Sequence, residues 1–166
     1  RMVSQPQAAL ILVSRETGRN LDAVKTLFSS MKQVILKNGA EGAMAAGKML
    51  PGDFEREYEN VRHIQENIIS YISELFSSGS LTPEQSEQAS GLLALIHCAS
   101  RIADRCSDIV TATGNMEKQG KKFSRDAMEE LGRCFAASER LYLQAIAILR
   151  AGADETTDSE TITKAK

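Results

Sequence analysis

The sequence predicts an all-α fold, an antiparallel up-and-down bundle of three to four long helices. Apolar residues recur at steps of three and four along four long stretches, and no stretch shows the alternation of a strand. Hydrophobic residues make up 42% of the chain but aromatic residues only 5%, without tryptophan. A core of small and aliphatic side chains suits helix packing, and 166 residues are enough for one domain with a sizeable core.

The clearest of these stretches runs from Thr82 to Met116. Thr82 and Gln85 fit a capping box, and Pro83 fits the first helical position, where a missing N–H costs nothing. At 1.5 Å per residue the helix would be roughly 50 Å long. A narrow apolar stripe of that length needs partner helices of similar length. The stripe comprises Ala89, Leu92, Leu93, Ile96, Ala99, Ile102, Ala103, Cys106, Ile109 and Val110.

Two further helices are expected before this stretch. The first begins at Pro6 and ends at Asn38-Gly39, a common left-handed stop signal. Residues 40–50, rich in alanine and glycine, predict a short helix or a compact connector. The second long helix is expected over residues 54–76, with Asp53 as its N-cap. Residues 77–80 then form a turn signal.

The third helix is expected to fade at Gly114, and a last long helix to start at Ser124. Beyond Gly152 the composition turns polar and rich in threonine. The predicted organisation is a helical bundle over residues 1–152 and a polar, flexible tail over 153–166. The predicted core contains Leu21, Val24, Ile64, Ile68, Leu92, Ile96, Ile102, Ile109, Leu131 and Leu141.

The overall composition argues against several classes of function. A net charge of −2 does not provide the Lys/Arg excess that a nucleic-acid surface needs. No apolar run approaches the roughly 18 residues of a membrane span. The sequence has no phosphate-binding loop, dinucleotide fingerprint, zinc spacing or nucleophile elbow, so we expect no enzyme. Because position 1 is not methionine, the chain is expected to be a fragment of a longer protein.

Few residues are candidates for metal binding. His63 and His97 each lie beside an apolar stripe and are interpreted as flanking residues. Asp104 and Asp108 lie one turn apart on the predicted third helix. The simpler interpretation of this pair is a solvated face, with Arg101 and Arg105 in ordinary ion pairs.

Residues 100–105, Ser-Arg-Ile-Ala-Asp-Arg, resemble the Glu-Arg-Ile-Gly-Asp-His signature of PhoU domains, which also lies in the middle of a long helix. Residues 71–75 and 81–84 resemble the helix-turn-helix junction of the same family. Residues 6–10 and 15–19 are similar to the segment that joins a sodium/phosphate cotransporter to its C-terminal PhoU-like domain. With Phe123-Ser124 resembling the start of the next repeat, the likeness covers Pro6 to Leu149.

The family-motif positions are Ser100, Arg101, Asp104 and Arg105. In the family, an acid four residues before the Asp helps it to bind iron or zinc clusters, and here that position is Ser100. The matching acids of the preceding helix fall near Tyr58 and Arg62, with Glu57 and Glu59 adjacent. We therefore expect no metal or other cofactor. The remaining weak candidates for metal ligands are Asp104, Asp108 and Glu57.

The resemblance implies a PhoU- or spectrin-like bundle that serves as a regulatory, membrane-associated domain of a sodium-dependent phosphate symporter. It would act at the cytoplasmic face of the membrane by contact with a transporter domain, either upstream in the same chain or separate. Two alternatives remain open: a free-standing PhoU-like adaptor for phosphate signalling, and a metal-carboxylate enzyme on a helical bundle. A homodimer is a further alternative, and nucleic acid is not an expected partner.

Overall fold

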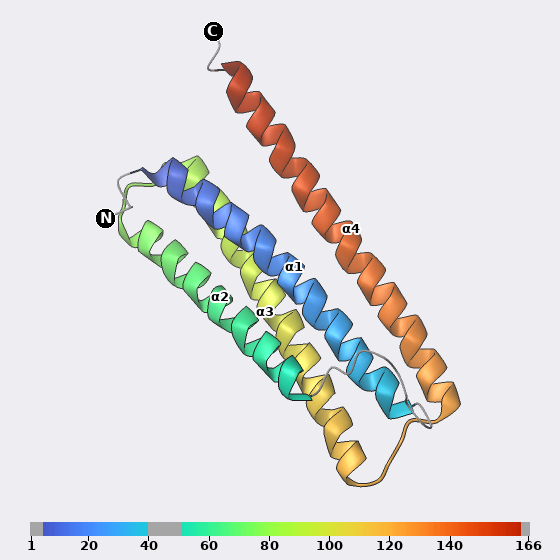
Figure 1. Cartoon of the computed structure of the whole chain (residues 1–166). Coiled ribbons are helices and arrows are strands. Elements are labelled where there is room, and N and C mark those ends of the chain that lie inside the picture. The colour runs from blue at the N-terminus through green and yellow to red at the C-terminus, as the bar shows by residue number, and fades with distance from the viewer. Residues whose placement is uncertain (1–4, 40–50, 164–166) are drawn as a thin grey trace. The chain divides into compact units, whose positions relative to one another are not determined.

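The structure, a computed structural model, describes the backbone of residues 5–39 and 51–163. Within these ranges it contains four helices and no strand, which confirms the all-α prediction (Figure 1). Helices α1, α2 and α3 belong to one compact unit, and α4 belongs to a second unit that begins at Ser124. The helices are α1 (Pro6–Gly39), α2 (Pro51–Ser77), α3 (Pro83–Lys118) and α4 (Arg125–Thr163).

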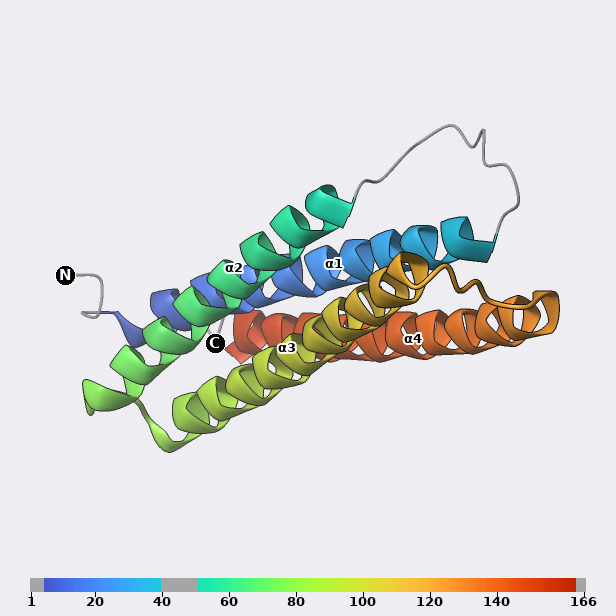
Figure 2. The same ribbon diagram turned by 90° about the horizontal axis from the view of Figure 1, so that it is seen from below.

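Helices α1, α2 and α3 pack against one another as an up-and-down three-helix bundle (Figures 1 and 2). α2 runs antiparallel to both of its neighbours, so that α1 and α3 start at the same end. At that end the Gln85 side-chain amide donates to Oε1 of Gln7 over 3.2 Å. The turn between α2 and α3 passes through Gly79, whose φ of 63° favours glycine because it has no Cβ. The short turn therefore enforces the antiparallel pairing of α2 with α3.

The start of α3 has the capping box predicted from the sequence. The Thr82 N–H donates to Oε1 of Gln85 over 3.0 Å, and the Gln85 N–H donates to Oγ1 of Thr82 over 3.3 Å. Pro83 is the first residue of the helix. These two bonds satisfy backbone donors that have no partner within the helix.

Thr82→Ala is expected to lower the free energy of unfolding by about 1 kcal/mol, because the Gln85 N–H loses its acceptor. Urea unfolding measures this change. Ser86→Ala, one turn into the helix, is a suitable control, because that side chain does not belong to the capping box. Equal stability of Thr82→Ala and the wild type would contradict the role of the cap.

The core of the three-helix unit follows a repeat of alternating steps of three and four on each helix, which is the spacing of knobs-into-holes packing. On α3 this repeat buries Ala89, Leu92, Ile96, Ala99, Ala103 and Cys106. One cluster joins all three helices at the end where α1 starts. Its members are Ala9, Leu10, Val13, Ile68, Ile72, Leu75, Ala89, Leu92 and Ile96.

Most of the predicted core residues within α1–α3 are buried. The predictions for Ile64 and Ile109 are wrong, because their side chains are 38% and 39% exposed. Each lies next to the repeat, about 100° around the helix from a residue that occupies it. On α2 that residue is Gln65, which is 2% exposed. Ile102 is only half-buried. A stripe drawn through apolar residues alone therefore misses a core position held by a polar side chain.

On α4 the prediction for Leu141 is also wrong, since its side chain is 69% exposed. The predicted stripe passes through Phe135, Ser138 and Leu141 in two consecutive steps of three. Each such step rotates by about 60° away from the starting face, so the second leaves it. Leu141 instead shares a face with Ile148, which is 73% exposed. Leu131 is half-buried.

Several predicted helix ends also need correction. α2 begins at Pro51, so Asp53 lies in the first turn and forms an ion pair with Arg56 instead of capping the helix. Proline in a first turn costs little, which allows the earlier start. α3 continues past Gly114 to Lys118, and α4 continues past Gly152 to Thr163. A single glycine costs only about 1 kcal/mol in a helix. The predicted element over residues 40–50 lies outside the described residues.

A polar pair interrupts the apolar packing between α1 and α2. The side-chain amide of Gln65 donates to Oδ1 of Asn20 over 3.1 Å, and the Asn20 amide donates to the carbonyl oxygen of Val61 over 3.4 Å. Asn20 is 1% exposed. Buried amides are tolerated where they find hydrogen-bond partners, and this pair provides them across the helix interface.

Across the described helices, no stretch combines the length and the apolar character that a bilayer-spanning helix requires.

Candidate functional site

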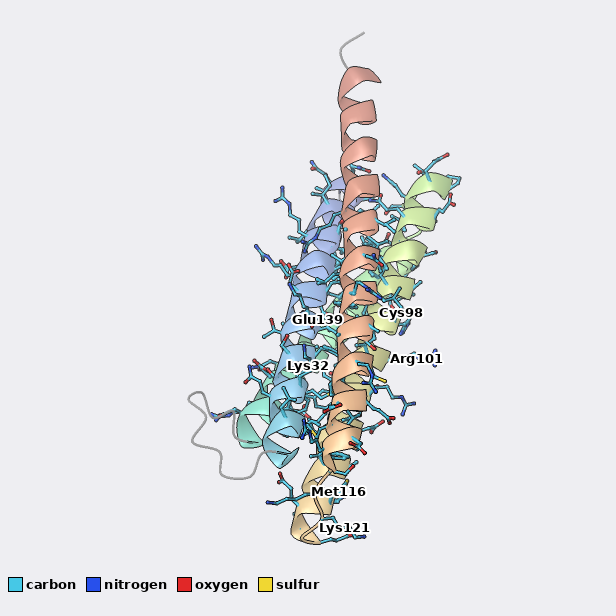
Figure 3. The ribbon with its side chains drawn as sticks, turned by 90° about the vertical axis from the view of Figure 1, so that its right-hand side faces the viewer. Lys32, Cys98, Arg101, Met116, Lys121 and Glu139 are labelled. Atoms are coloured by element: carbon cyan, nitrogen blue, oxygen red, sulfur yellow. The ribbon has the colours of Figure 1, made fainter. Side chains whose placement is uncertain are left out.

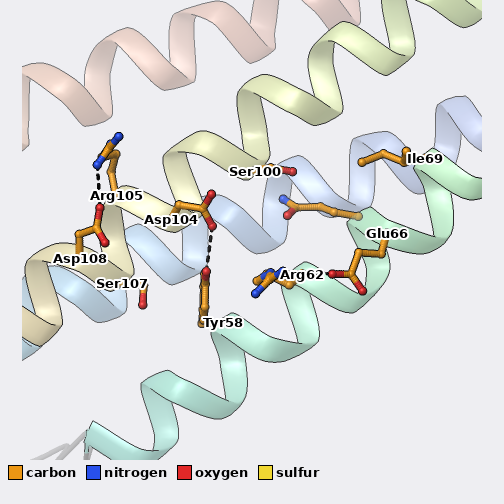
Figure 4. A pocket seen from close by; sticks show the side chains of 10 residues that line it. Tyr58, Arg62, Glu66, Ile69, Ser100, Asp104, Arg105, Ser107 and Asp108 are labelled. Carbon is orange, nitrogen blue, oxygen red and sulfur yellow. Dashed lines mark hydrogen bonds and ion pairs between the residues drawn. The ribbon is translucent and has the colours of Figure 1, made fainter.

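An open groove of about 610 Å³ runs between α2 and α3 (Figure 4). Its lining is mainly polar and carries both signs of charge, in contrast to the apolar core beside it. Ligand sites typically combine a concave surface with a few convergent polar groups. The groove is lined by Tyr58, Arg62, Gln65, Glu66 and Ile69 from α2 and by Ser100, Asp104, Arg105, Ser107 and Asp108 from α3.

Helical spacing brings these side chains to one side of each helix. On α2, Tyr58, Arg62 and Ile69 follow one another at steps of four and seven, which keeps them on one face. On α3, Ser100, Asp104 and Asp108 are spaced by one turn each. Because α2 and α3 pack side by side, the two faces border the same groove.

The centre of the groove is a hydrogen bond between the two helices. The Tyr58 hydroxyl donates to Oδ1 of Asp104 over 2.8 Å, and in Figure 4 both side chains point into the space between the ribbons. The guanidinium of Arg62 lies over the Tyr58 ring, 5.9 Å from the ring centre. Partial burial, followed by the carboxylate of Asp104, raises the pKa of Tyr58. A phenol is protonated at neutral pH even without this shift, and the raised pKa reinforces the role of the Tyr58 hydroxyl as a donor.

The raised pKa of Tyr58 is expected in an absorbance titration of the phenolate at 295 nm. The difference between wild type and Tyr58→Phe isolates this residue, and its midpoint should lie above the ordinary value of about 10. Asp104→Asn should move the midpoint back toward that value, because the negative charge is gone. A raised pKa means that the folded state holds the proton more tightly. The contribution of Tyr58 to stability is therefore present below pH about 10 and is lost as the pH rises further.

Two of the three acids in the groove are paired with arginines of their own helix. Nη2 of Arg62 lies 3.2 Å from Oε1 of Glu66, and Nη1 of Arg105 lies 2.7 Å from Oδ2 of Asp108. All four side chains are exposed, so each pair contributes little to stability. Among the described residues, Asp104 has no such ion pair, and its bond to Tyr58 is to a neutral group.

The arrangement corrects one interpretation from the sequence. Arg105 pairs with Asp108 as expected, but Arg101 forms no ion pair with Asp104. Arg101 is exposed and does not line the groove. Figure 3 shows it on α3 near Cys98. The aspartates one turn apart therefore have different surroundings.

The family positions identified in the sequence come together in part. Ser100, Asp104 and Arg105 line the groove, and so do Tyr58 and Arg62, the positions of α2 that the register matched to them. Glu57 and Glu59 do not line it. Glu57 is half-buried on another face of α2, and its Oε2 is a buried atom that has no hydrogen-bond partner among the described residues. Of the weak metal candidates, only Asp104 and Asp108 share the groove.

The residues of the groove do not fit an iron or zinc cluster. Asp104 faces a phenol and a guanidinium where a metal site would need further anionic or imidazole ligands. Asp108 is occupied by Arg105. Within residues 5–39 and 51–163, no three His, Cys, Asp or Glu side chains converge in a way that would hold a metal ion.

Sequence reasoning missed Gln65, Glu66, Ile69 and Ser107 as groove residues. Gln65 is buried and also bonds to Asn20 in the core, so it connects the floor of the groove to α1. Gln65 lies four residues after Val61 and three before Ile68, which is the spacing of a core position. A pattern that counts only apolar residues leaves it out, because glutamine is polar.

A second, apolar groove of about 310 Å³ lies between α1 and α2. Leu12, Val13, Ile64 and Ile68 line it, and Ile64 owes its exposure to this position. Tyr71 also lines it, and the buried Tyr71 hydroxyl has no hydrogen-bond partner within the part of the chain that the structure describes.

Chemically, the α2–α3 groove is suited to recognition. His63 and His97 do not line it, and its phenol has a raised pKa, which is the wrong direction for a nucleophile. What it offers is two arginine–acid pairs, hydroxyl groups and one carboxylate without an ion pair. Comparison with protein-family models, curated proteins and solved structures finds no match for this chain.

Proposed function

We propose that this helical bundle is a regulatory domain of the PhoU type, which acts by protein contact on a sodium-dependent phosphate transporter at the cytoplasmic face of the membrane. The observation that supports the proposal is the α2–α3 groove. It gathers Ser100, Asp104 and Arg105, the positions that resemble the PhoU signature, with Tyr58 and Arg62 of the facing helix. Residues that lie far apart in the sequence therefore border one groove.

The chemistry of the groove favours contact over turnover. Its ionisable groups are carboxylates, guanidinium groups and a protonated phenol, and it lacks the nucleophile–base pair that covalent catalysis needs. The groove is open, and its lining extends over residues 58–69 of α2 and 100–108 of α3, so a segment of another protein can lie along it. These properties support a non-enzymatic role.

Regulation by contact requires a difference in binding between two states of the transporter. A domain that bound both states equally would shift nothing. We propose that the bundle contacts one state of the transporter more extensively than the other. A tenfold preference corresponds to about 1.4 kcal/mol, which a few polar contacts can supply.

The test is phosphate uptake in vesicles that carry the full-length transporter, either intact or lacking residues 20–166. Removal of the bundle is expected to change the rate or the apparent affinity of sodium-dependent uptake, with the amount of transporter in the membrane measured by immunoblot. The matched control replaces residues 20–166 with an unrelated helical bundle of similar length. Unchanged rate and affinity at equal expression would overturn the proposed function.

A further inference from the structure

Asp104 is the acid of the groove that forms no ion pair with a described residue. Glu66 and Asp108 each have an arginine within ion-pair distance, whereas Asp104 has none among the described residues. Arg62 points into the same space and is attracted to Asp104, but the acid within ion-pair distance of it is Glu66, and its guanidinium lies over the Tyr58 ring (Figure 4). With three acids and two arginines, the lining of the groove carries one net negative charge, and Asp104 is the acid without an ion pair.

The hydrogen bond to Tyr58 holds this charge in position. The phenol fixes Oδ1 of Asp104 from the α2 side, and it does so without neutralising the carboxylate. Among the described residues, none donates a hydrogen bond to the second carboxylate oxygen of Asp104. An oriented carboxylate with a free oxygen is a good acceptor for a cationic donor, because charge-assisted hydrogen bonds are stronger than neutral ones.

We propose that the groove receives an arginine or lysine side chain from a basic segment of the partner protein, with Asp104 as its anchor. This inference rests on the proposed function and names the partner chemistry of the same site. Cytoplasmic loops of membrane proteins carry an excess of lysine and arginine. A transporter at the cytoplasmic face therefore offers the charge that the groove lacks.

The rest of the lining suits a long cationic side chain better than a free ion. Ile69 supplies an apolar surface for the methylene stem of lysine or arginine. Ser100 and Ser107 line the α3 side. A metal ion would need several convergent ligands, and only one carboxylate is free. Because the site is exposed, binding should be weak and should decrease with salt.

The probe is a short peptide of alternating alanine and arginine with capped ends, and its control is the same peptide with citrulline, which keeps the shape but has no charge. Binding to the full chain is followed by two-dimensional NMR. The arginine peptide is expected to shift the amide signals of Tyr58, Ser100 and Asp104, and the citrulline peptide is not. Asp104→Asn should weaken binding about tenfold, the loss expected for one charge-assisted bond.

Two variants distinguish binding through the Asp104 carboxylate from a general attraction between the peptide and the negatively charged chain. Glu74→Gln changes the net charge by the same amount on an exposed residue outside the groove, so it should leave the affinity unchanged. Tyr58→Phe keeps the charge of Asp104 but removes the hydrogen bond that holds it, so it should weaken binding, though less than Asp104→Asn. Equal weakening by Asp104→Asn and Glu74→Gln, or equal binding of the citrulline peptide, would overturn the inference. Asparagine can still accept the Tyr58 hydrogen bond, so Asp104→Asn is expected to fold.

The outcomes distinguish this inference from the proposed function. If removal of residues 20–166 changes uptake but Asp104→Asn binds the arginine peptide normally, the regulatory role stands and the anchor is wrong. If removal has no effect on uptake but the peptide binds through Asp104, the recognition chemistry stands and the transporter is not its target.

Discussion

Ile96→Ala is expected to lower the free energy of unfolding by about 2–5 kcal/mol, because the truncation removes buried methyl groups and leaves a cavity. The Ile96 side chain is completely buried and belongs to the cluster that joins all three helices of the bundle. Interiors of this kind are close-packed, so the surrounding side chains can fill the gap only in part. Urea unfolding followed by circular dichroism measures the loss as a lower midpoint at an unchanged slope.

Ile109→Ala on the same helix is the matched control. This side chain is 39% exposed, so its truncation removes less buried surface and leaves no enclosed cavity. Its expected cost is below about 1 kcal/mol. A stability of Ile96→Ala equal to that of Ile109→Ala would contradict the position of Ile96 in the core.

The helices and most of the core could be predicted because they depend on local chemistry. The capping box of Thr82 and Gln85 involves neighbours in the sequence, and it forms as the sequence implies. Ile96, Ile68 and Val24 follow a repeat that needs no knowledge of the partner helix. Helix ends were less predictable, because one glycine or a polar composition is too weak a signal to end a helix.

The groove could be predicted only in part, because it depends on how two helices face each other. Asp104 and Ser100 were identified on α3, and their register placed Tyr58 and Arg62 opposite them. The distinction between Asp104 and Asp108 was not accessible from the sequence. Both aspartates have an arginine nearby in the chain, and the structure shows which of them forms an ion pair.

Gln65 shows the limit of pattern reasoning most clearly. A polar side chain is buried only where a partner satisfies it, and the partner, Asn20, lies in another helix. Neither residue alone predicts the pair. The sequence therefore indicated Ile64 as the core residue, whereas the packing selected Gln65.

Asn20→Leu and Gln65→Met are each expected to lower the free energy of unfolding by about 1–3 kcal/mol, because each leaves its partner buried without a hydrogen bond. In Asn20→Leu the Gln65 amide loses its acceptor, and in Gln65→Met Oδ1 of Asn20 loses its donor. The replacements have a similar shape but are somewhat larger, so the surrounding side chains must adjust slightly. Both variants are compared with wild type by urea unfolding.

The double variant is the decisive measurement, because it removes both polar groups and leaves neither unpaired. Replacing a complete buried polar pair by apolar side chains of similar shape can be nearly neutral, whereas breaking it is costly. The double variant of Asn20 and Gln65 should therefore lose less stability than either single variant, with a coupling energy of about 1 kcal/mol or more. Additive losses would mean that the two side chains are stabilised independently. Gln65 also lines the α2–α3 groove, so Asn20→Leu removes the hydrogen bond between a groove residue and α1 without replacing any residue of the lining.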